Sequence, residues 1–147
     1  GWNVLSCRYF AAVCERTLMH KLAASGFTRV EASRSGVTFW RDDDFIALNH
    51  AVETYPIYSP FVGIGRLNKT KEGFDCRDEV PLWFMVPEES PLRLYFNWTF
   101  SSEEELGEAL QRILDELIQP VALPMLADEK AKEGLYKRFD EYRESRR

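Results

Sequence analysis

The residues best suited to chemistry lie in one stretch, NHAVETYPIYSPFVGIG, which spans positions 49–65. It holds His50, one of two histidines in the chain, and Glu53 three residues later. A histidine beside a carboxylate is a common arrangement for general acid–base catalysis. On a regular β-strand, however, side chains alternate between faces, so an offset of three separates His50 from Glu53. The residues that share the face of His50 are apolar, which predicts a buried structural histidine.

Two glycines, Gly63 and Gly65, end the same stretch and raise the question of a phosphate-binding loop. A dinucleotide fingerprint needs a third glycine and a helix that starts there, and a P-loop needs Gly-Lys followed by Ser or Thr. Arg66 and Leu67 follow here instead. We therefore predict that both glycines lie on one face of a strand, where missing side chains allow a bend or the close approach of a helix.

The remaining residues give little support for a metal site or a cofactor site. His20 is the only other histidine, and the three cysteines lack the paired spacing of a zinc site. The consecutive acids at positions 42–44 are typical of a solvated turn. The chain also lacks the Gly-x-Ser-x-Gly motif that exposes a nucleophile at a strand-to-helix turn. The sequence thus predicts no metal, no cofactor and no catalytic residue, and favours a non-catalytic role.

One alternative stays open, namely a small-molecule or hydrolytic pocket between the sheet and a helix. It would use His50 with an acid that folding brings near, either Asp44 or Glu53. A concave cavity with His50 and a carboxylate of raised pKa in its wall would support this hypothesis. Burial of His50 without a cavity would count against it.

Composition narrows the classes of function. The chain has 147 residues, of which 45% are hydrophobic and 14% aromatic, enough for one folded domain with its own core. A net charge of −5 does not indicate the basic surface that binding to nucleic acid or to anionic lipid requires. No apolar run approaches the roughly 18 residues of a membrane span. Three cysteines in helical or polar surroundings favour a reducing compartment, so we predict a cytoplasmic protein.

Periodicity predicts the elements that position these residues. Apolar residues at steps of three and four predict a helix over residues 4–25, with Gly26 as a left-handed cap. Six segments read as strands of an antiparallel meander: 27–32, 37–41, 45–54, 61–67, 82–86 and 92–100. Residues 68–80 are polar without a clear period and are predicted to form a loop. Overlapping capping boxes at Ser101 and Ser102 open a helix that should end near Pro120, and a last helix begins near Asp128. The predicted fold is a single α+β domain with two C-terminal helices packed on the sheet.

Large aromatics mixed with arginine and asparagine are typical of interaction surfaces. Side chains alternate between the two faces of a strand, so where two aromatic residues are adjacent in the sequence, one of them points to the face that does not pack on the helices. We predict a binding face that carries Trp40, Arg66, Trp83, Met85, Arg93, Tyr95 and Asn97. A terminal helix that covered this face would instead make it a second small core.

The order GFTRV, GVTFWR and FIALNH, then a sheet, then SSEEELGEALQRIL and LPML, resembles small bacterial proteins described only as domains of unknown function. The strand motif FWR (residues 39–41) and the Leu-Pro break carry this resemblance. It implies an α+β domain of bacterial, cytoplasmic origin and brings no catalytic residues. Some proteins with similar layouts sit in toxin–immunity neighbourhoods, which favours an immunity-type or accessory role. The partner would be a protein or a second copy in a homodimer, and neither nucleic acid nor a membrane.

Overall fold

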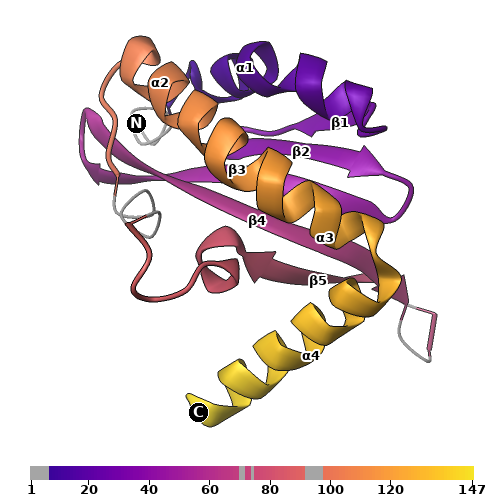
Figure 1. The fold of residues 1–147 in the computed structure, drawn as a ribbon. Coiled ribbons are helices and arrows are strands. Elements are labelled where there is room, and N and C mark those ends of the chain that lie inside the picture. Colours follow the sequence, from indigo (N-terminus) through magenta and orange to yellow (C-terminus); the bar gives the residue numbers. More distant parts are fainter. Residues whose placement is uncertain (1–6, 70–71, 74, 92–97) are drawn as a thin grey trace.

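The computed structural model describes residues 7–69, 72–73, 75–91 and 98–147 (Figure 1). These residues form an α+β fold in which an N-terminal helix precedes a five-stranded antiparallel sheet and further helices follow it. The first half consists of helix α1 (Phe10–Ala24) and strands β1 (Arg29–Ala32), β2 (Gly36–Arg41), β3 (Asp44–Thr54), β4 (Ile57–Lys69) and β5 (Asp75–Pro81). The second half consists of a 3₁₀ helix (Leu82–Met85), α2 (Glu103–Ile113), a π-helical segment (Leu114–Ala122), α3 (Leu123–Ala127) and α4 (Glu129–Ser145).

Helix α1 forms as its apolar spacing predicts, and it ends at the predicted cap. Gly26 has a φ of +92°, and its N–H donates to Ala23 O while the Phe27 N–H donates to Leu22 O. These two bonds make a Schellman motif, which satisfies carbonyls at the end of the helix. The helix begins at Phe10 rather than at residue 4. Residues 4–6 of the predicted helix lie outside the described residues.

The sheet is a meander in which each strand pairs with the next along the chain, in the order β1-β2-β3-β4-β5. Strands β2 and β3 lie where the alternating pattern predicts them, whereas β4 contains the predicted segment 61–67 but begins four residues earlier, at Ile57, and ends at Lys69. The predicted sixth strand is not among the described residues, because most of residues 92–100 fall outside them. Phe100, at the end of that stretch, makes a single antiparallel bridge with Tyr58.

Two predictions around β5 are wrong. Part of the predicted loop 68–80 is strand β5, whose polar residues face solvent on one side and an arginine on the other. The predicted strand 82–86 is instead a 3₁₀ helix that follows Pro81 and buries Leu82. Four consecutive bulky apolar residues, LWFM, carry no alternation, and the tight turn sends them in different directions.

The C-terminal region holds three helices rather than the predicted two, because Pro120 does not end the second. Ser102 caps α2 by accepting from the Glu105 N–H at 3.1 Å, as the capping box predicts. The chain then widens into the π-helical segment, which contains Pro120 and runs directly into α3. In α-helical geometry the proline ring meets the carbonyl four residues earlier, and a wider π turn relieves this contact. Asp128 alone separates α3 from α4 and caps α4 through two backbone N–H groups.

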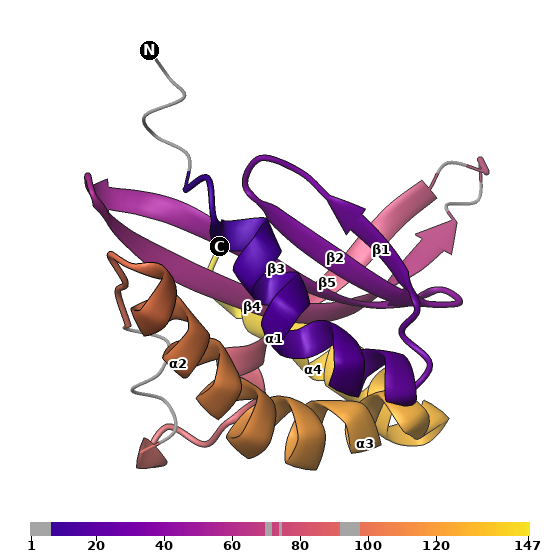
Figure 2. The same ribbon diagram turned by 90° about the horizontal axis from the view of Figure 1, so that it is seen from above.

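The helices gather on one side of the sheet (Figures 1 and 2). The main core lies between the two layers and includes apolar residues from all four helices. On the sheet side, one cross-strand row of Phe39, Ile46, Ile64 and Val80 is almost fully buried. Each such side chain stabilises the fold by roughly 1.5–3 kcal/mol. The opposite face of the sheet is therefore left to other side chains.

Candidate binding face

The residues that alternate with the core rows point away from the helices, and we call this surface the open face. Cross-strand register places Arg29, Trp40, Phe45, Gly65 and Glu79 in one row across the five strands. The open face includes Arg29, Glu31, Thr38, Trp40, Phe45, Ala47, Asn49, Phe61, Gly63, Gly65, Leu67, Asp75, Arg77 and Glu79.

A second, small apolar cluster forms on the open face around Trp40. Trp40 packs against Phe45 at 5.1 Å between ring centroids and is only 3% exposed. Two guanidinium groups cover it, since the carbon of Arg29 lies 4.7 Å and that of Arg77 lies 5.1 Å from the indole centroid. Cation–π contacts of this kind hold the charge of an arginine over the face of an aromatic ring. The predicted face residue Trp40 therefore lies on this face, beneath arginines rather than in solvent.

The two glycines also lie on the open face, as predicted, but no described helix approaches them. A Cβ at Gly65 would overlap the ring of Phe45, and one at Gly63 would come within 2.8 Å of the Glu79 carboxylate. The missing side chains therefore make room for Phe45 and Glu79. Of the two predicted reasons for these glycines, a bend or the close approach of a helix, the second is wrong, because the described helices cover the other face.

The open face is hollowed in two adjoining places. The first hollow, of about 320 Å³, is lined by Arg29, Trp40 and Cys76 among others. The second, of about 210 Å³, is lined by Thr38, Asn49 and Glu79 among others. Glu31 and Arg77 belong to both. Strands β1 and β5 stand at opposite ends of the sheet order, so the sheet is curved enough for both edges to line the same hollows.

Charge on this face is mixed, and Arg29, Glu31, Arg77 and Glu79 are all exposed. Arg29 Nη1 lies 3.1 Å from Glu31 Oε1 within β1. On β5, burial raises the pKa of Glu79, and the neighbouring Arg77 opposes this shift.

Large apolar side chains are exposed around the β3–β4 hairpin. Phe61 on the open face is 55% exposed, and Ile57 and Tyr55 near the hairpin turn are 40% and 59% exposed. Singly scattered apolar residues need no explanation, but these lie close together along one hairpin. Ile57 and Phe61 have the open-face parity along β4, whereas the Tyr55 ring packs edge-on against Tyr58 of the main core.

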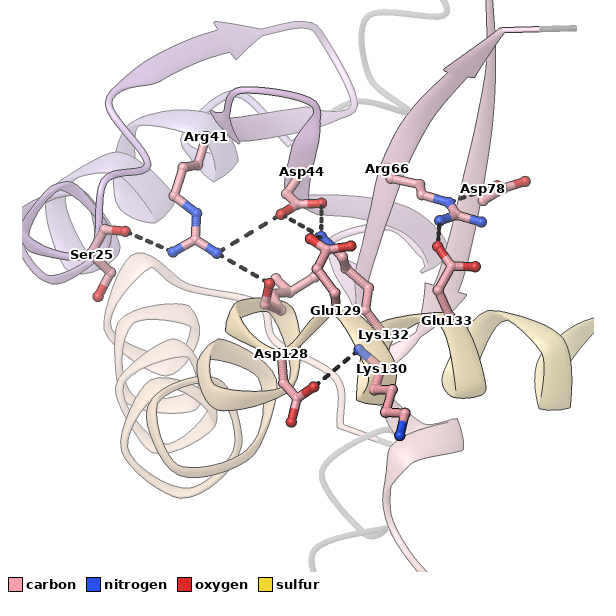
Figure 3. Close-up of polar contacts among 11 residues, drawn as sticks. Ser25, Arg41, Asp44, Arg66, Asp78, Asp128, Glu129, Lys130, Lys132 and Glu133 are labelled. Atoms are coloured by element: carbon pink, nitrogen blue, oxygen red, sulfur yellow. Dashed lines mark hydrogen bonds and ion pairs between the residues drawn. The ribbon is translucent and has the colours of Figure 1, made fainter.

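Several residues of the predicted face lie elsewhere. Arg66 points toward the helices, where it lies 3.2 Å from Asp78 and pairs with Glu133 of α4 (Figure 3). Trp83 and Met85 belong to the 3₁₀ helix, and the Trp83 ring stacks edge-on against α4. The remaining predicted face residues, Arg93, Tyr95 and Asn97, lie outside the described residues.

The three residues of the alternative pocket are not brought together. Glu53 accepts a hydrogen bond from Ser59 Oγ near the hairpin turn. Asp44 begins β3 and binds Lys132 at 3.1 Å (Figure 3). His50 lies six positions after Asp44 along the strand, a span of about 20 Å.

His50 itself is buried against the start of the chain. Its Nε2 accepts a hydrogen bond of 2.8 Å from the backbone N–H of Cys7, and the rings of Phe10 and Tyr58 pack on it. Burial lowers its pKa, so it is neutral near pH 7. His50 lines neither hollow of the open face. Its role in the fold is that of an acceptor for a buried backbone group.

Two further features concern possible ligands. Among the residues that the structure describes, no group of three or more His, Cys, Asp or Glu side chains could hold a metal ion. The described part of the chain also contains no helix with the length and apolarity that crossing a membrane requires.

Sequence reasoning missed Arg29, Phe61, Arg77 and Glu79. Arg77 and Glu79 fall in the segment predicted to be a loop, so no face could be assigned to them. Phe61 lies in a predicted strand, and alternation puts its side chain on the other face from Val62 and Ile64. Alternation alone does not show which of the two faces a helix covers. The repeated Arg-x-Glu spacing at 29–31 and 77–79 was the available signal.

Comparison with known proteins finds no matching family model, no matching curated protein and no matching solved structure. The resemblance to small bacterial domains therefore stays a prediction, and inference about function depends on the open face itself.

Proposed function

We propose that this chain is a non-catalytic binding domain that engages a protein partner through the open face. The observation that carries the proposal is the placement of the described helices on one side of the sheet, which leaves the other side hollowed and lined with aromatic and charged side chains. Aromatic residues and arginine are enriched where proteins meet. An immunity-type or accessory role suits such a domain, and a second copy is the other partner that this face could receive.

The chemistry of the open face supports binding more than catalysis. Trp40 and Phe45 form a rigid floor, arginines and glutamates stand around it, and exposed Phe61 continues it along the hairpin. The hydrolytic alternative lacks a carboxylate beside His50, because Asp44 and Glu53 are held by other partners. The free thiols of the three cysteines agree with the predicted cytoplasmic location.

The test compares two double variants that keep the core intact. Phe61→Ser/Arg77→Gln alters exposed residues of the open face, and Lys137→Gln/Arg138→Gln alters exposed residues of α4 as a matched control. A partner would be captured from a lysate of the source organism, identified by mass spectrometry, purified and titrated calorimetrically. We expect the open-face variant to bind at least tenfold more weakly and the control to bind like the wild type. Equal binding by all three proteins, each folded by circular dichroism, would contradict the proposal.

Self-association is measured in parallel by sedimentation equilibrium. A dimer that is lost in the open-face variant and kept in the control variant would identify the second copy as the partner. A dimer that survives in both variants would place its interface outside the open face.

A further inference from the structure

Strand β1 stands at one end of the sheet, and its outer edge has no neighbouring strand. Among the described residues, β1 pairs with β2 alone, and the sheet order begins with it (Figure 1). Arg29, Glu31 and Ala32 are exposed, and Val30 is half-buried against the core. An open edge of this kind presents backbone N–H and C=O groups with which a further strand can pair.

The hairpin between β1 and β2 shows which backbone groups of β1 point outward. The Ser33 N–H donates to Gly36 O at 2.8 Å, so these two residues form a hydrogen-bonded pair. Hydrogen-bonded and non-hydrogen-bonded pairs alternate along an antiparallel ladder. Glu31, two residues before Ser33, therefore also directs its backbone groups toward β2. The backbone groups of Val30 and Ala32 point the other way, away from the sheet.

The exposed side chains of β1 carry two charges of opposite sign. Arg29 and Glu31 share the open face and form an ion pair of 3.1 Å between Nη1 and Oε1. Charged residues commonly protect an edge strand against pairing with another chain. Here the protection depends on the register, because a two-fold axis through the residue between the two charges brings each charge opposite its counter-charge.

The register centred on Val30 satisfies the backbone and the side chains together. A two-fold axis at Val30 lets its outward N–H and C=O bond the same groups of a second copy. Arg29 then faces Glu31 of that copy, and Glu31 faces its Arg29, at non-hydrogen-bonded positions where side chains lie closest. An axis moved by one residue, to Arg29 or to Glu31, places like charges opposite each other. An axis at Ala32 runs the pairing into the turn at residues 34–35.

The strand at the other end of the sheet, β5, lacks this property although it also contains an Arg-x-Glu sequence. An axis at Arg77 would place two arginines opposite each other and set Asp75 against Glu79. An axis at Glu79 would place two glutamates opposite each other. An axis at Asp78 would bring together two aspartates, each already paired with Arg66 of its own copy. The charge pattern therefore distinguishes β1 from β5.

We propose that a second copy of this chain pairs with the outer edge of β1, antiparallel and about a two-fold axis at Val30. The sheets of the two copies then join into one sheet, and Arg29 and Glu31 of both copies form a single cluster of alternating charge. The contact is isologous, so it closes as a dimer rather than continuing as a filament. It goes beyond the proposed function, because it uses the edge of the sheet rather than the open face.

Charge reversal on β1 tests the register. Self-association is measured by sedimentation equilibrium at low salt up to about 1 mM protein, because so short a contact makes a weak dimer. Arg29→Glu and Glu31→Arg, each alone, set like charges opposite each other and should weaken the dimer about tenfold. An equimolar mixture of the two variants restores opposite charges and should associate about tenfold more tightly than either alone. The matched variants Arg77→Glu and Glu79→Arg on β5 should associate like the wild type, alone or mixed.

A second pair of variants tests the backbone. Ala32→Pro removes an N–H that points away from the sheet, and an edge strand tolerates proline at such a position. This variant should keep the circular dichroism spectrum of the wild type and lose the dimer. Ala32→Ser keeps the N–H and should keep the dimer.

A wild type that remains monomeric at about 1 mM would overturn the inference. The same conclusion would follow if the mixed charge variants associated no more tightly than each alone, or if the dimer survived in folded Ala32→Pro. These results leave the open face to be judged by its own test, in which the captured partner is titrated against Phe61→Ser/Arg77→Gln. The edge dimer should survive in that double variant, so the two proposals can fail separately.

Discussion

The buried contact between His50 and the Cys7 backbone makes the stability of this protein dependent on pH. Nε2 of His50 must be unprotonated to accept the 2.8 Å hydrogen bond, and protonation would place two donors against each other in a buried site. Its pKa is lowered because burial disfavours the charged ring. The titratable side chains near it, Cys7 and Tyr58, have pKa values raised by burial and stay neutral in the same range.

The direction and size of the effect follow from proton linkage. An unfolded histidine takes up a proton as the pH falls through about 6.5, whereas His50 in the fold resists until a lower pH. The stability that His50 contributes is therefore complete above the unfolded value and is lost as the pH falls from there toward the lowered value. The loss is up to about 1.4 kcal/mol for each pH unit within that interval.

The assay is urea unfolding followed by tryptophan fluorescence between pH 7.5 and 5.5. His20 is replaced by Gln in every protein, so that His50 is the only histidine that titrates. In this background, His50→Gln keeps a carbonyl acceptor that does not titrate, and its stability should fall less with pH than that of the parent. His50→Phe fills the space but leaves the Cys7 N–H without its acceptor, so it should lose about 1–3 kcal/mol at every pH. If the free energies of unfolding of the parent and of His50→Gln differ by the same amount at every pH from 7.5 to 5.5, the reasoning is wrong.

Four further predictions concern stability and can be measured by the same unfolding assay. Gly65→Ala should destabilise the protein by about 1–3 kcal/mol because the new methyl group meets neighbouring backbone and an aromatic ring. Gly107→Ala in α2, where nothing lies within 4 Å, should stabilise it by about 0.5–1 kcal/mol, and a loss at Gly107 would count against this account of the glycines. Lys132→Met should cost about 3 kcal/mol because it leaves Asp44 without its closest cation. The double variant Lys132→Met/Asp44→Leu should cost less than the sum of the two single changes, and a cost equal to that sum would show that the ion pair is not coupled. Ser102→Ala should cost about 1 kcal/mol through loss of the α2 cap, and an unchanged unfolding midpoint would mean that another group replaces it.

The parts of the fold that follow local rules could be predicted, and the parts that depend on distant partners could not. Gly26 and Ser102 mark helix ends through short-range chemistry, and both act as predicted. Strand β5 was missed because its helix-facing position 78 is an aspartate. That residue suits the interior only because Arg66, which lies 12 residues earlier, meets it across the sheet. No period in a single segment can reveal such a pair.

The same limit applies to the binding face. Alternation correctly put Trp40 on the side away from the core, but the arginines that cover it come from both edges of the sheet. Their positions depend on the curvature of the whole sheet and on the register of four strand pairs. Arg66 was assigned to the open face although its parity along β4 matches that of Ile64, which faces the core. Correct grouping needed the full register.

The position of Cys76 gives the protein a natural attachment point for a reporter group. Of the three cysteines, Cys7 and Cys14 are buried and have raised pKa values, so they react poorly with thiol reagents, whereas Cys76 is exposed and lines the first hollow. A maleimide dye added to the unaltered chain should therefore attach beside Arg77. Side chains alternate along a strand, so the Cys76 sulfur belongs to the side of β5 opposite Arg77 and Glu79. A dye on this sulfur would therefore mark the edge strand next to the open face, without an engineered cysteine, and would leave the charged side chains of that face unaltered.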